Sequence, residues 1–348
     1  MIIETIKKLA KGDDITHEEM RETMSEIFDG RTRVEDTTEF LRDLTAKGES
    51  DCELLAMLES MEEHAISIRP RCSGRMIDVC GTGGDRMRTF NVSTTAAFVV
   101  AASGVYVAKH GNRSTTGISG SADIFEYFGY DLNMDPEKVR DIIERFRIGF
   151  MFAQKFHPSM RNVAEARKAV GTRTAFNLLG PLSNPAGVKD QLVGVFSPDY
   201  LRRVINILRS RGSENAITVI SGDGLDELST TSKNKVCEMS SGKIREFVLD
   251  PEELGLHRAP ISEIQVSTKE ESFRSFVSVL NGTAKKAMIE VTALNAAAGL
   301  VVGGMADTIG DGLGVALETI NGGKSFSLLR DFIRHCGDTG KLEEMAKN

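Results

Sequence analysis

Apolar and polar positions follow two different patterns along the chain, and the change falls near Pro70. Residues 2–68 show only the helical spacing of apolar side chains, with capping boxes at Thr16 and Ser50 that mark two helix starts. The apolar stripe of this region is typical of a helix core or of a contact between subunits. The pattern predicts a small helical bundle without catalytic residues.

Beyond residue 72, short apolar strands alternate with glycine-rich loops and helices, a pattern typical of βαβ units. Residues 173–187 are so rich in Gly, Pro and Asn that we expect an ordered loop there. The expected strands are residues 76–80, 105–108, 191–196 and 216–221, with a hairpin at 235–249 and mostly helices at 270–335. The sequence thus predicts a larger α/β domain with a mostly parallel central sheet beside the helical bundle.

Composition narrows the class of protein. A length of 348 residues favours two domains, and a net charge of −7 without a basic cluster disfavours nucleic-acid binding. The five cysteines form no C-x-x-C pair, which fits a reducing compartment and disfavours a disulfide framework or a zinc site. No secretory or membrane-spanning apolar run is present. We therefore expect a cytoplasmic protein that binds neither nucleic acid nor membrane.

Three loops carry the candidate chemistry, and the first loop (residues 81–94) opens with Gly81-Thr82-Gly83-Gly84-Asp85. Glycines let backbone N–H groups approach an anion, and the start of the following helix adds a positive dipole. This pattern favours a phosphate or pyrophosphate over a tight turn alone, and it matches neither common nucleotide fingerprint. The polar side chains that follow suit phosphate and hydroxyl recognition, although helix capping alone could explain two of them. These side chains are Thr89, Asn91, Ser93 and Thr94.

The second loop (residues 109–121) begins with Lys109-His110-Gly111-Asn112-Arg113 and continues with several hydroxyl side chains. Such a cationic, donor-rich segment at the carboxyl end of a strand favours anion binding over a solvated turn. The third loop (residues 223–227) carries Asp226 and Glu227, which suit a hard divalent cation such as Mg²⁺ but are also common on surfaces. A polyphosphate at the other two loops would favour the metal interpretation.

Seven motifs in series make the sequence resemble the anthranilate phosphoribosyltransferase family nearly end to end. They are GTGGD, TFNVST, KHGNR, SGSAD, HPSMRNV, RTAFNLLGPLSNPA and GDGLDE. The resemblance implies transfer of the phosphoribosyl group from phosphoribosyl pyrophosphate to anthranilate, in tryptophan biosynthesis. It also implies Mg²⁺, two ions per site, and a homodimer formed through the helical part.

The resemblance assigns residues by their match to the family motifs. Residues expected to hold phosphoribosyl pyrophosphate are Gly81, Gly84, Asp85, Thr89, Asn91, Ser93, Thr94, Lys109, Gly117 and Ser121. Those expected around anthranilate are Gly81, His110, Asn112 and Arg167, and those expected to hold the metal are Ser93, Asp226 and Glu227. No catalytic acid or base is expected, because the attacking aromatic amine is already neutral and positioning with electrostatic stabilisation can account for the reaction.

The resemblance also implies domain bounds. Residues 1–72 and 163–185 would form the helical domain, which would serve dimerisation and the anthranilate side. Residues 73–162 and 186–348 would form the α/β domain that binds phosphoribosyl pyrophosphate. Without the resemblance, the sequence pattern would indicate that Arg167 is a surface arginine.

Several positions depart from the family pattern. Arg86 stands where the family usually has glycine, and a positive φ there would cost about 1–2 kcal/mol. Met87 and Arg88 also change the first loop, Ile118 stands where a basic residue is common, and Ile220-Ser221 replaces a His-Gly pair.

Two rival functions are weighed against the transferase. A pyrimidine nucleoside phosphorylase shares this architecture, but KHGNR and GLDE favour the transferase. A catalytically silent relative that binds nucleic acid or a protein partner would be expected to lose Lys109 or the Asp226-Glu227 pair, and both are retained.

Overall fold

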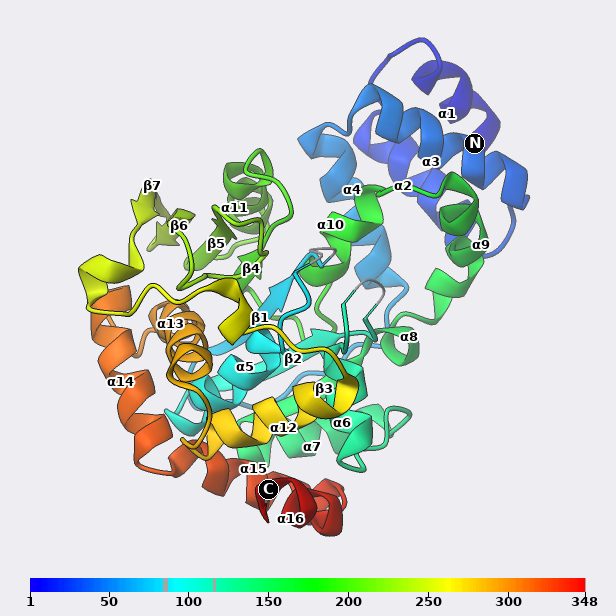
Figure 1. The fold of residues 1–348 in the computed structure, drawn as a ribbon. Coiled ribbons are helices and arrows are strands. Elements are labelled where there is room, and N and C mark those ends of the chain that lie inside the picture. Colours follow the sequence, from blue (N-terminus) through cyan, green and yellow to red (C-terminus); the bar gives the residue numbers. More distant parts are fainter. Residues whose placement is uncertain (84–86, 115–116, 348) are drawn as a thin grey trace. The chain divides into compact units, whose positions relative to one another are not determined.

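The computed structural model describes residues 1–83, 87–114 and 117–347, and the chain divides into two compact units (Figure 1). The helical unit comprises Met1–Ser67 and Ala153–Pro185, and the α/β unit comprises Ile68–Phe152 and Ala186–Asn348. The bounds 1–72 and 163–185 expected from the sequence therefore need correction at two places. Residues 68–72 belong to the α/β unit, and residues 153–162 belong to the helical unit because they pack with its helices.

The helical unit follows the apolar spacing of its sequence. Its elements are α1 (Ile2–Leu9), α2 (His17–Phe28), α3 (Val34–Lys47), α4 (Asp51–Glu63), α8 (Ala153–Phe156), α9 (Arg161–Val170) and α10 (Ala175–Leu182). Both predicted capping boxes form: Thr16 accepts a hydrogen bond from the Glu19 amide, and Ser50 accepts one from the Glu53 amide, each at 3.3 Å. The prediction of helices alone before residue 68 is confirmed.

The prediction of a loop at residues 173–187 is wrong, because α10 occupies its centre. The helix buries Phe176, Leu179 and Leu182 on one face, and this burial outweighs the poor helix propensity of Gly and Pro. Pro181 lies in the last turn, where the missing N–H removes one backbone hydrogen bond and interrupts no further turns.

The described strands of the α/β unit form one seven-stranded sheet in the order β3-β2-β1-β4-β5-β6-β7. The first five strands in this order pair in parallel, and β6 and β7 form an antiparallel hairpin beside β5. The mostly parallel sheet is therefore confirmed. The strands are β1 (Met76–Gly81), β2 (Tyr106–Gly111), β3 (Ile148–Phe152), β4 (Asp190–Gly194), β5 (Ala216–Ser221), β6 (Asn234–Ser240) and β7 (Lys243–Leu249).

Strand β3 has no counterpart among the strands expected from the sequence. Its residues are all buried, so the segment lacks the alternation that marks a half-buried strand. Arg147 precedes it with φ of +58°, a left-handed helix end for which glycine is the usual sign.

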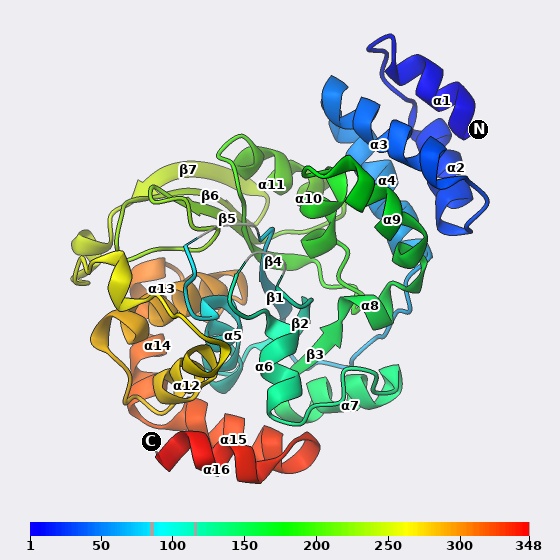
Figure 2. The same ribbon diagram turned by 45° about the vertical axis from the view of Figure 1, so that its right-hand side comes forward.

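Helices surround the sheet of the α/β unit (Figures 1 and 2). Helices α5 and α13 both contact β1, whereas α11 contacts β5 and β6. The remaining helices from α12 onward, coloured yellow to red, gather along one flank (Figure 2). The helices of this unit are α5 (Val92–Ala102), α6 (Ser121–Tyr127), α7 (Pro136–Phe146), α11 (Tyr200–Ser210), α12 (Lys269–Leu280), α13 (Lys286–Val302), α14 (Ile309–Asn321), α15 (Lys324–Cys336) and α16 (Thr339–Lys347).

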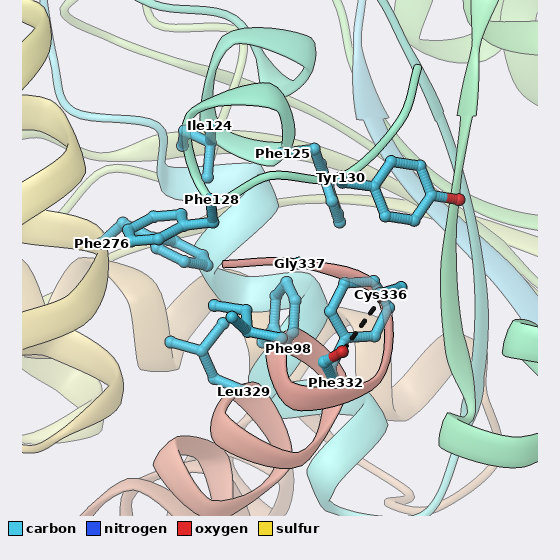
Figure 3. Close-up of a pocket in the computed structure, with 11 residues that line it drawn as sticks. Phe98, Ile124, Phe125, Phe128, Tyr130, Phe276, Leu329, Phe332, Cys336 and Gly337 are labelled. Carbon is cyan, nitrogen blue, oxygen red and sulfur yellow. Dashed lines mark hydrogen bonds between the residues drawn. The ribbon is translucent and has the colours of Figure 1, made fainter. Parts of the chain in front are cut away.

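An aromatic cluster fills the core between α5, α6, α12 and α15 (Figure 3). Phe125 stacks on Phe150 with ring centroids 4.4 Å apart, and Phe98 meets Phe332 edge to face at 5.5 Å. The small pocket among these rings has no charged side chain in its lining. It offers nothing to hold a phosphate or a carboxylate, so the candidate site lies elsewhere.

Candidate active site

The chain reverses its winding direction between β1 and β4. From β1 the chain proceeds through α5 to β2 on one side, and from β4 it proceeds through α11 to β5 on the other. In open parallel sheets, ligands bind outside the carboxyl ends of the strands at such a switch point. The two strands end there with Gly81 paired to Gly194.

The third loop lies directly over this glycine pair. The backbone N–H of Gly83 donates to Asp226 Oδ2 at 2.6 Å. A Cβ on Gly81 would lie 2.5 Å from Asp226 Oδ2, and one on Gly194 would lie 1.5 Å from the Asp226 carbonyl oxygen. Both positions therefore require glycine for Asp226 to reach the strand ends. Gly194 is not among the residues expected from the sequence, because a lone glycine in an apolar strand gives no sign of its neighbour.

The first loop also contacts the third loop at the start of α5. The backbone N–H of Ser93 donates to Glu227 Oε1 at 2.9 Å. A carboxylate at a helix start is favoured by the unpaired N–H groups there. Asn91 caps the same helix, since its side-chain oxygen accepts from the Thr94 amide at 3.2 Å. The capping residue is thus Asn91, whereas Ser93 and Thr94 lie inside the helix.

The second loop joins the first through two hydrogen bonds. Thr94 Oγ1 donates to Ser121 Oγ at 2.8 Å, and Asn91 Nδ2 donates to the Ser119 carbonyl at 3.4 Å. Gly117 is exposed on the same loop. The structure therefore brings all three loops together at one edge of the sheet.

Lys109 lies inside this arrangement. Its side chain is 1% exposed, and Nζ donates to the Val79 carbonyl at 2.6 Å. Burial lowers the pKa of Lys109, while the nearby carboxylates of Asp78 and Glu227 act in the opposite direction. The lysine side chain is thus desolvated, and the carboxylates of Asp78 and Glu227 favour its charged form.

The residues expected around anthranilate differ from one another in burial. His110 is buried, and its backbone N–H donates to Asp78 Oδ1 at 3.4 Å. Asn112 is exposed, and its side-chain oxygen accepts from the Arg113 amide at 2.8 Å. Asp78 was missed by the sequence analysis, although an acid within an apolar strand was a visible signal.

Arg167 belongs to the helical unit, where it lies on α9. Its guanidinium carbon lies 5.5 Å from the centre of the Phe176 ring, a cation–π contact. Burial lowers the pKa of Arg167 from its usual value. The side chain is therefore a half-buried, ordered arginine, which differs from the surface residue that the sequence pattern alone suggests.

The departure at residues 220–221 has a structural explanation. Ser221 Oγ accepts from the Leu225 amide at 2.8 Å and also bonds the Asp223 carboxylate. Asp223 accepts a further hydrogen bond from Ser229 at 2.8 Å and one from Thr231. Burial raises the pKa of Asp223, but these hydroxyl groups outweigh it and leave the pKa below its usual value. This hydroxyl cluster fixes the turn that leads into Asp226.

Two buried asparagines hold the other end of the third loop. Asn295 of α13 pairs with both backbone groups of Leu228, at 2.9 Å to the N–H and 2.7 Å to the carbonyl. Asn234 accepts from the Ser229 amide at 2.7 Å. The two metal-binding candidates are thus anchored on both sides by residues that no motif of the loop itself reveals.

Some candidates lie beyond what the structure describes. Gly84, Asp85 and Arg86 lie outside the described residues, so no geometry bears on them. Over the described ranges, there is no group of three or more His, Cys, Asp or Glu side chains that could hold a metal ion. Likewise, none of the described helices has the length and apolar character needed to span a membrane.

Comparisons with known proteins agree with this architecture. Residues 73–326 match the α/β domain of a glycosyl transferase family, and residues 3–65 match the helical bundle domain of the same family. The chain is 55% identical to the anthranilate phosphoribosyltransferase of Nitrosopumilus maritimus (strain SCM1) over 99% of both sequences. It is 41% identical to that of Methanosarcina barkeri (strain Fusaro / DSM 804), over 92% of this chain and 86% of the relative.

Solved structures give the same result. The crystal structure of anthranilate phosphoribosyltransferase from Thermus thermophilus is similar with a TM-score of 0.89 and 37% identity, over 97% of this chain and 99% of that one. The enzyme from Saccharomyces cerevisiae, in complex with phosphoribosyl pyrophosphate and Mg, shares the fold with a TM-score of 0.86 at 23% identity, over 99% of this chain and 98% of that one. The chain belongs to the anthranilate phosphoribosyltransferase family.

Proposed function

We propose that the protein transfers the phosphoribosyl group from phosphoribosyl pyrophosphate to anthranilate, giving N-(5-phosphoribosyl)anthranilate and pyrophosphate. The observation that carries this proposal is the meeting of the three loops at the β1–β4 switch point. Direct hydrogen bonds join the first loop to the third and the first to the second. A sugar that carries both a phosphate and a pyrophosphate suits such a glycine-rich, hydroxyl-rich edge.

Phosphoribosyl pyrophosphate would lie against the first and second loops. Thr89, Asn91, Ser93, Thr94, Lys109, Gly117 and Ser121 lie on these two loops, and Gly81, Gly84 and Asp85 complete the proposed set. The hydroxyl of Thr82 is buried and has no hydrogen-bond partner among the described residues, which leaves a donor for a phosphate oxygen or a water.

Magnesium fits the third loop. Mg²⁺ commonly uses one or two carboxylates together with substrate phosphates and water, so a cage of three protein ligands is not needed. Asp226 and Glu227 supply the carboxylates beside Ser93, and we propose that these three residues hold two ions per site. When bound, magnesium would offset the negative charge of the leaving pyrophosphate.

The protein's own residues would act by position and charge. In the reaction, the C1′–O bond to pyrophosphate breaks, the anthranilate nitrogen forms the C1′–N bond, and the amine gives up one proton. Charge builds on the pyrophosphate oxygens and on the ribose ring as in glycosyl transfer generally. Lys109 provides a desolvated positive charge for the leaving group, and such charges act strongly in sites that exclude water. A neutral amine needs no strong base.

Anthranilate would be held by Gly81, His110, Asn112 and Arg167. A guanidinium presents paired N–H donors that match a carboxylate, so Arg167 suits the acid group of the substrate. Its contact with Phe176 keeps the side chain ordered within the helical unit. Asn112 and His110 would then orient the amine for attack.

The wider setting is proposed with the reaction. The product would serve tryptophan biosynthesis, the protein would act in the cytoplasm, and the helical unit would form a homodimer.

A fluorescence assay tests the activity. When the purified protein is mixed with anthranilate, phosphoribosyl pyrophosphate and Mg²⁺, the anthranilate fluorescence should decrease. EDTA should prevent this decrease. An unchanged signal over a wide range of protein concentration would overturn the assignment. Release of a free base from a pyrimidine nucleoside and phosphate would instead indicate the phosphorylase activity of this architecture.

A further inference from the structure

Residues 264–272, which we call the strap, comprise a segment that runs alongside the first loop and the first turn of α12 (Figure 1). The Phe90 amide donates to the Ile264 carbonyl at 3.2 Å, and the Val266 amide donates to the Arg88 carbonyl at 2.9 Å. Gln265 Nε2 adds a bond to the Met87 carbonyl at 2.8 Å. The strap thus pairs with the first loop like a short antiparallel strand.

The backbone that the strap holds is strained. Arg88 has φ of +53°, a left-handed conformation that side chains other than glycine rarely adopt. Such strain persists only where surrounding bonds determine the conformation, and it is frequent at ligand clamps. The bonds from Val266 and Gln265 on either side of this peptide supply that constraint.

The same strap also contacts the second loop. Lys269 Nζ lies 2.7 Å from Asp123 Oδ1, and Ser272 Oγ lies 2.6 Å from Ser119 Oγ. Ser272 is fully buried, whereas the Lys269 side chain is 58% exposed. One short segment therefore reaches both loops that are proposed to bind the substrate.

Asp123 links the strap to the second loop, because its carboxylate bonds both segments. Its Oδ2 accepts from the amides of Gly120 at 2.8 Å and Ser114 at 3.4 Å. Burial raises the pKa of Asp123, but the hydrogen bond from Lys269 and the backbone N–H groups outweigh it and hold the pKa below its usual value. The carboxylate is therefore an anion that closes the second loop and pairs with the strap.

Apolar packing reinforces these polar contacts. Ile264 and Val266 belong to a buried cluster that includes Phe90 of the first loop and Leu225 of the third. Ile118 of the second loop packs against the same cluster. The family departure at Ile118 thus places an apolar side chain where all three loops and the strap meet.

We propose that the strap is a positioning element, with Gln265 and Lys269 as positioning residues that hold the first and second loops in register for phosphoribosyl pyrophosphate. The inference rests on the proposed function, because it concerns the affinity of that site for its substrate. Neither side chain needs to touch the substrate. Loosening either contact lets one loop move, and small displacements of binding groups have large effects on a site built on position.

Calorimetric titration with phosphoribosyl pyrophosphate and Mg²⁺ tests the strap. Lys269→Met should raise the Kd on the order of tenfold, which corresponds to about 1.4 kcal/mol. Lys269→Arg, which retains the cation, should stay within about twofold of the wild type. Gln265→Ala should also weaken binding, and the KM for anthranilate should change by less than about twofold in all three variants.

The matched control is Arg274→Met, which removes a cation from the same helix. Arg274 pairs with Glu270, one turn away on α12, at 3.1 Å. That pair lies within the helix and joins neither loop to the strap. Wild-type affinity in Lys269→Met, or an equal loss in Arg274→Met, would overturn the role of the strap.

Amide hydrogen exchange separates this inference from the proposed function. In Gln265→Ala, residues 87–90 should exchange faster than in the wild type, and in Lys269→Met residues 117–121 should do so. Unchanged exchange in both variants would refute the strap even if the enzyme is active. A wild-type protein that fails to bind phosphoribosyl pyrophosphate, with exchange altered as expected, would refute the proposed function alone.

Discussion

The parallel part of the sheet and its antiparallel hairpin carry similar residue types, but these residues have different roles. The parallel strands β1, β2, β4 and β5 end at a common edge, where their loops exchange hydrogen bonds. The hairpin of β6 and β7 turns back through Ser241 and Gly242, both at positive φ. Arg245 of this hairpin pairs with Glu238 on the neighbouring strand at 2.9 Å.

The difference shows that residue type alone does not make a site. Glu227 and Glu246 are both acids that follow or lie within strands of the same sheet. Glu227 accepts from the start of α5, whereas Glu246 is half exposed and pairs with Arg202 at 3.1 Å. Binding sites form where the strand ends converge, because several loops can present groups to one ligand there.

The largest expected effect comes from the acids of the third loop. The double substitution Asp226→Asn and Glu227→Gln should reduce turnover by at least about a hundredfold, because it removes the charge proposed to hold magnesium. The Tm should change little, since amides are nearly isosteric with carboxylates. Activity in the fluorescence assay and circular-dichroism melting provide the two measurements.

The control for that substitution lies in the hairpin. Glu246→Gln removes a carboxylate from a surface ion pair, and such pairs contribute about 0–1 kcal/mol. Turnover should remain at the wild-type level. Equal losses in the hairpin and third-loop variants would remove the distinction between the two halves of the sheet.

A methyl group at the switch point should have the next largest effect. Gly194→Ala places a Cβ 1.5 Å from the Asp226 carbonyl, so either the strand or the third loop must move. We expect a loss of about 3 kcal/mol in the free energy of unfolding, together with a higher magnesium requirement. Urea unfolding and a magnesium activation curve measure the two effects.

The same chemical change elsewhere provides the control. Gly314 lies inside α14, and a Cβ there would meet no atom within 4 Å apart from the backbone of its own helix. Gly314→Ala should stabilise the protein by about 0.5–1 kcal/mol without altering turnover, because alanine favours the helix. If Gly194→Ala left the free energy of unfolding unchanged or raised it, as Gly314→Ala should, the close approach of Asp226 would be contradicted.

A pH dependence gives the smallest predicted effect. Burial lowers the pKa of Lys109, so the lysine loses its charge at a lower pH than an ordinary lysine does. The kcat/KM for phosphoribosyl pyrophosphate, which reports the free enzyme, should therefore decline on the alkaline side before pH reaches the usual lysine value of about 10.4. A constant kcat/KM up to that pH would show that the charge of Lys109 is not required.

Much of the fold follows from local patterns that the sequence displays openly. The capping boxes at Thr16 and Ser50 and the parallel strands depend on neighbouring residues, and the prediction holds for them. Strand β3 and helix α10 escaped prediction because their tertiary surroundings decide them. Full burial hides the alternation of β3, and apolar packing overrides Gly180 and Pro181 in α10.

The candidate site divides in the same way. The motif residues of the three loops could be identified along the chain, and hydrogen bonds join the first loop to the second and to the third. The supporting residues could not be identified, because their partners are distant in sequence. Asn295 supports Leu228 from 67 positions away, and Gln265 bonds Met87 across 178. Nothing local in α13 or in the strap indicates these contacts.

We propose that the three loops form one site for a metal and a polyphosphate. Electron paramagnetic resonance of Mn²⁺, used in place of Mg²⁺, tests it directly. We expect tight Mn²⁺ binding only when phosphoribosyl pyrophosphate is present, and loss of that binding in the Asp226→Asn, Glu227→Gln variant. Equal Mn²⁺ binding by the wild type and this variant, or binding that does not depend on phosphoribosyl pyrophosphate, would show that the three loops do not form one metal and polyphosphate site.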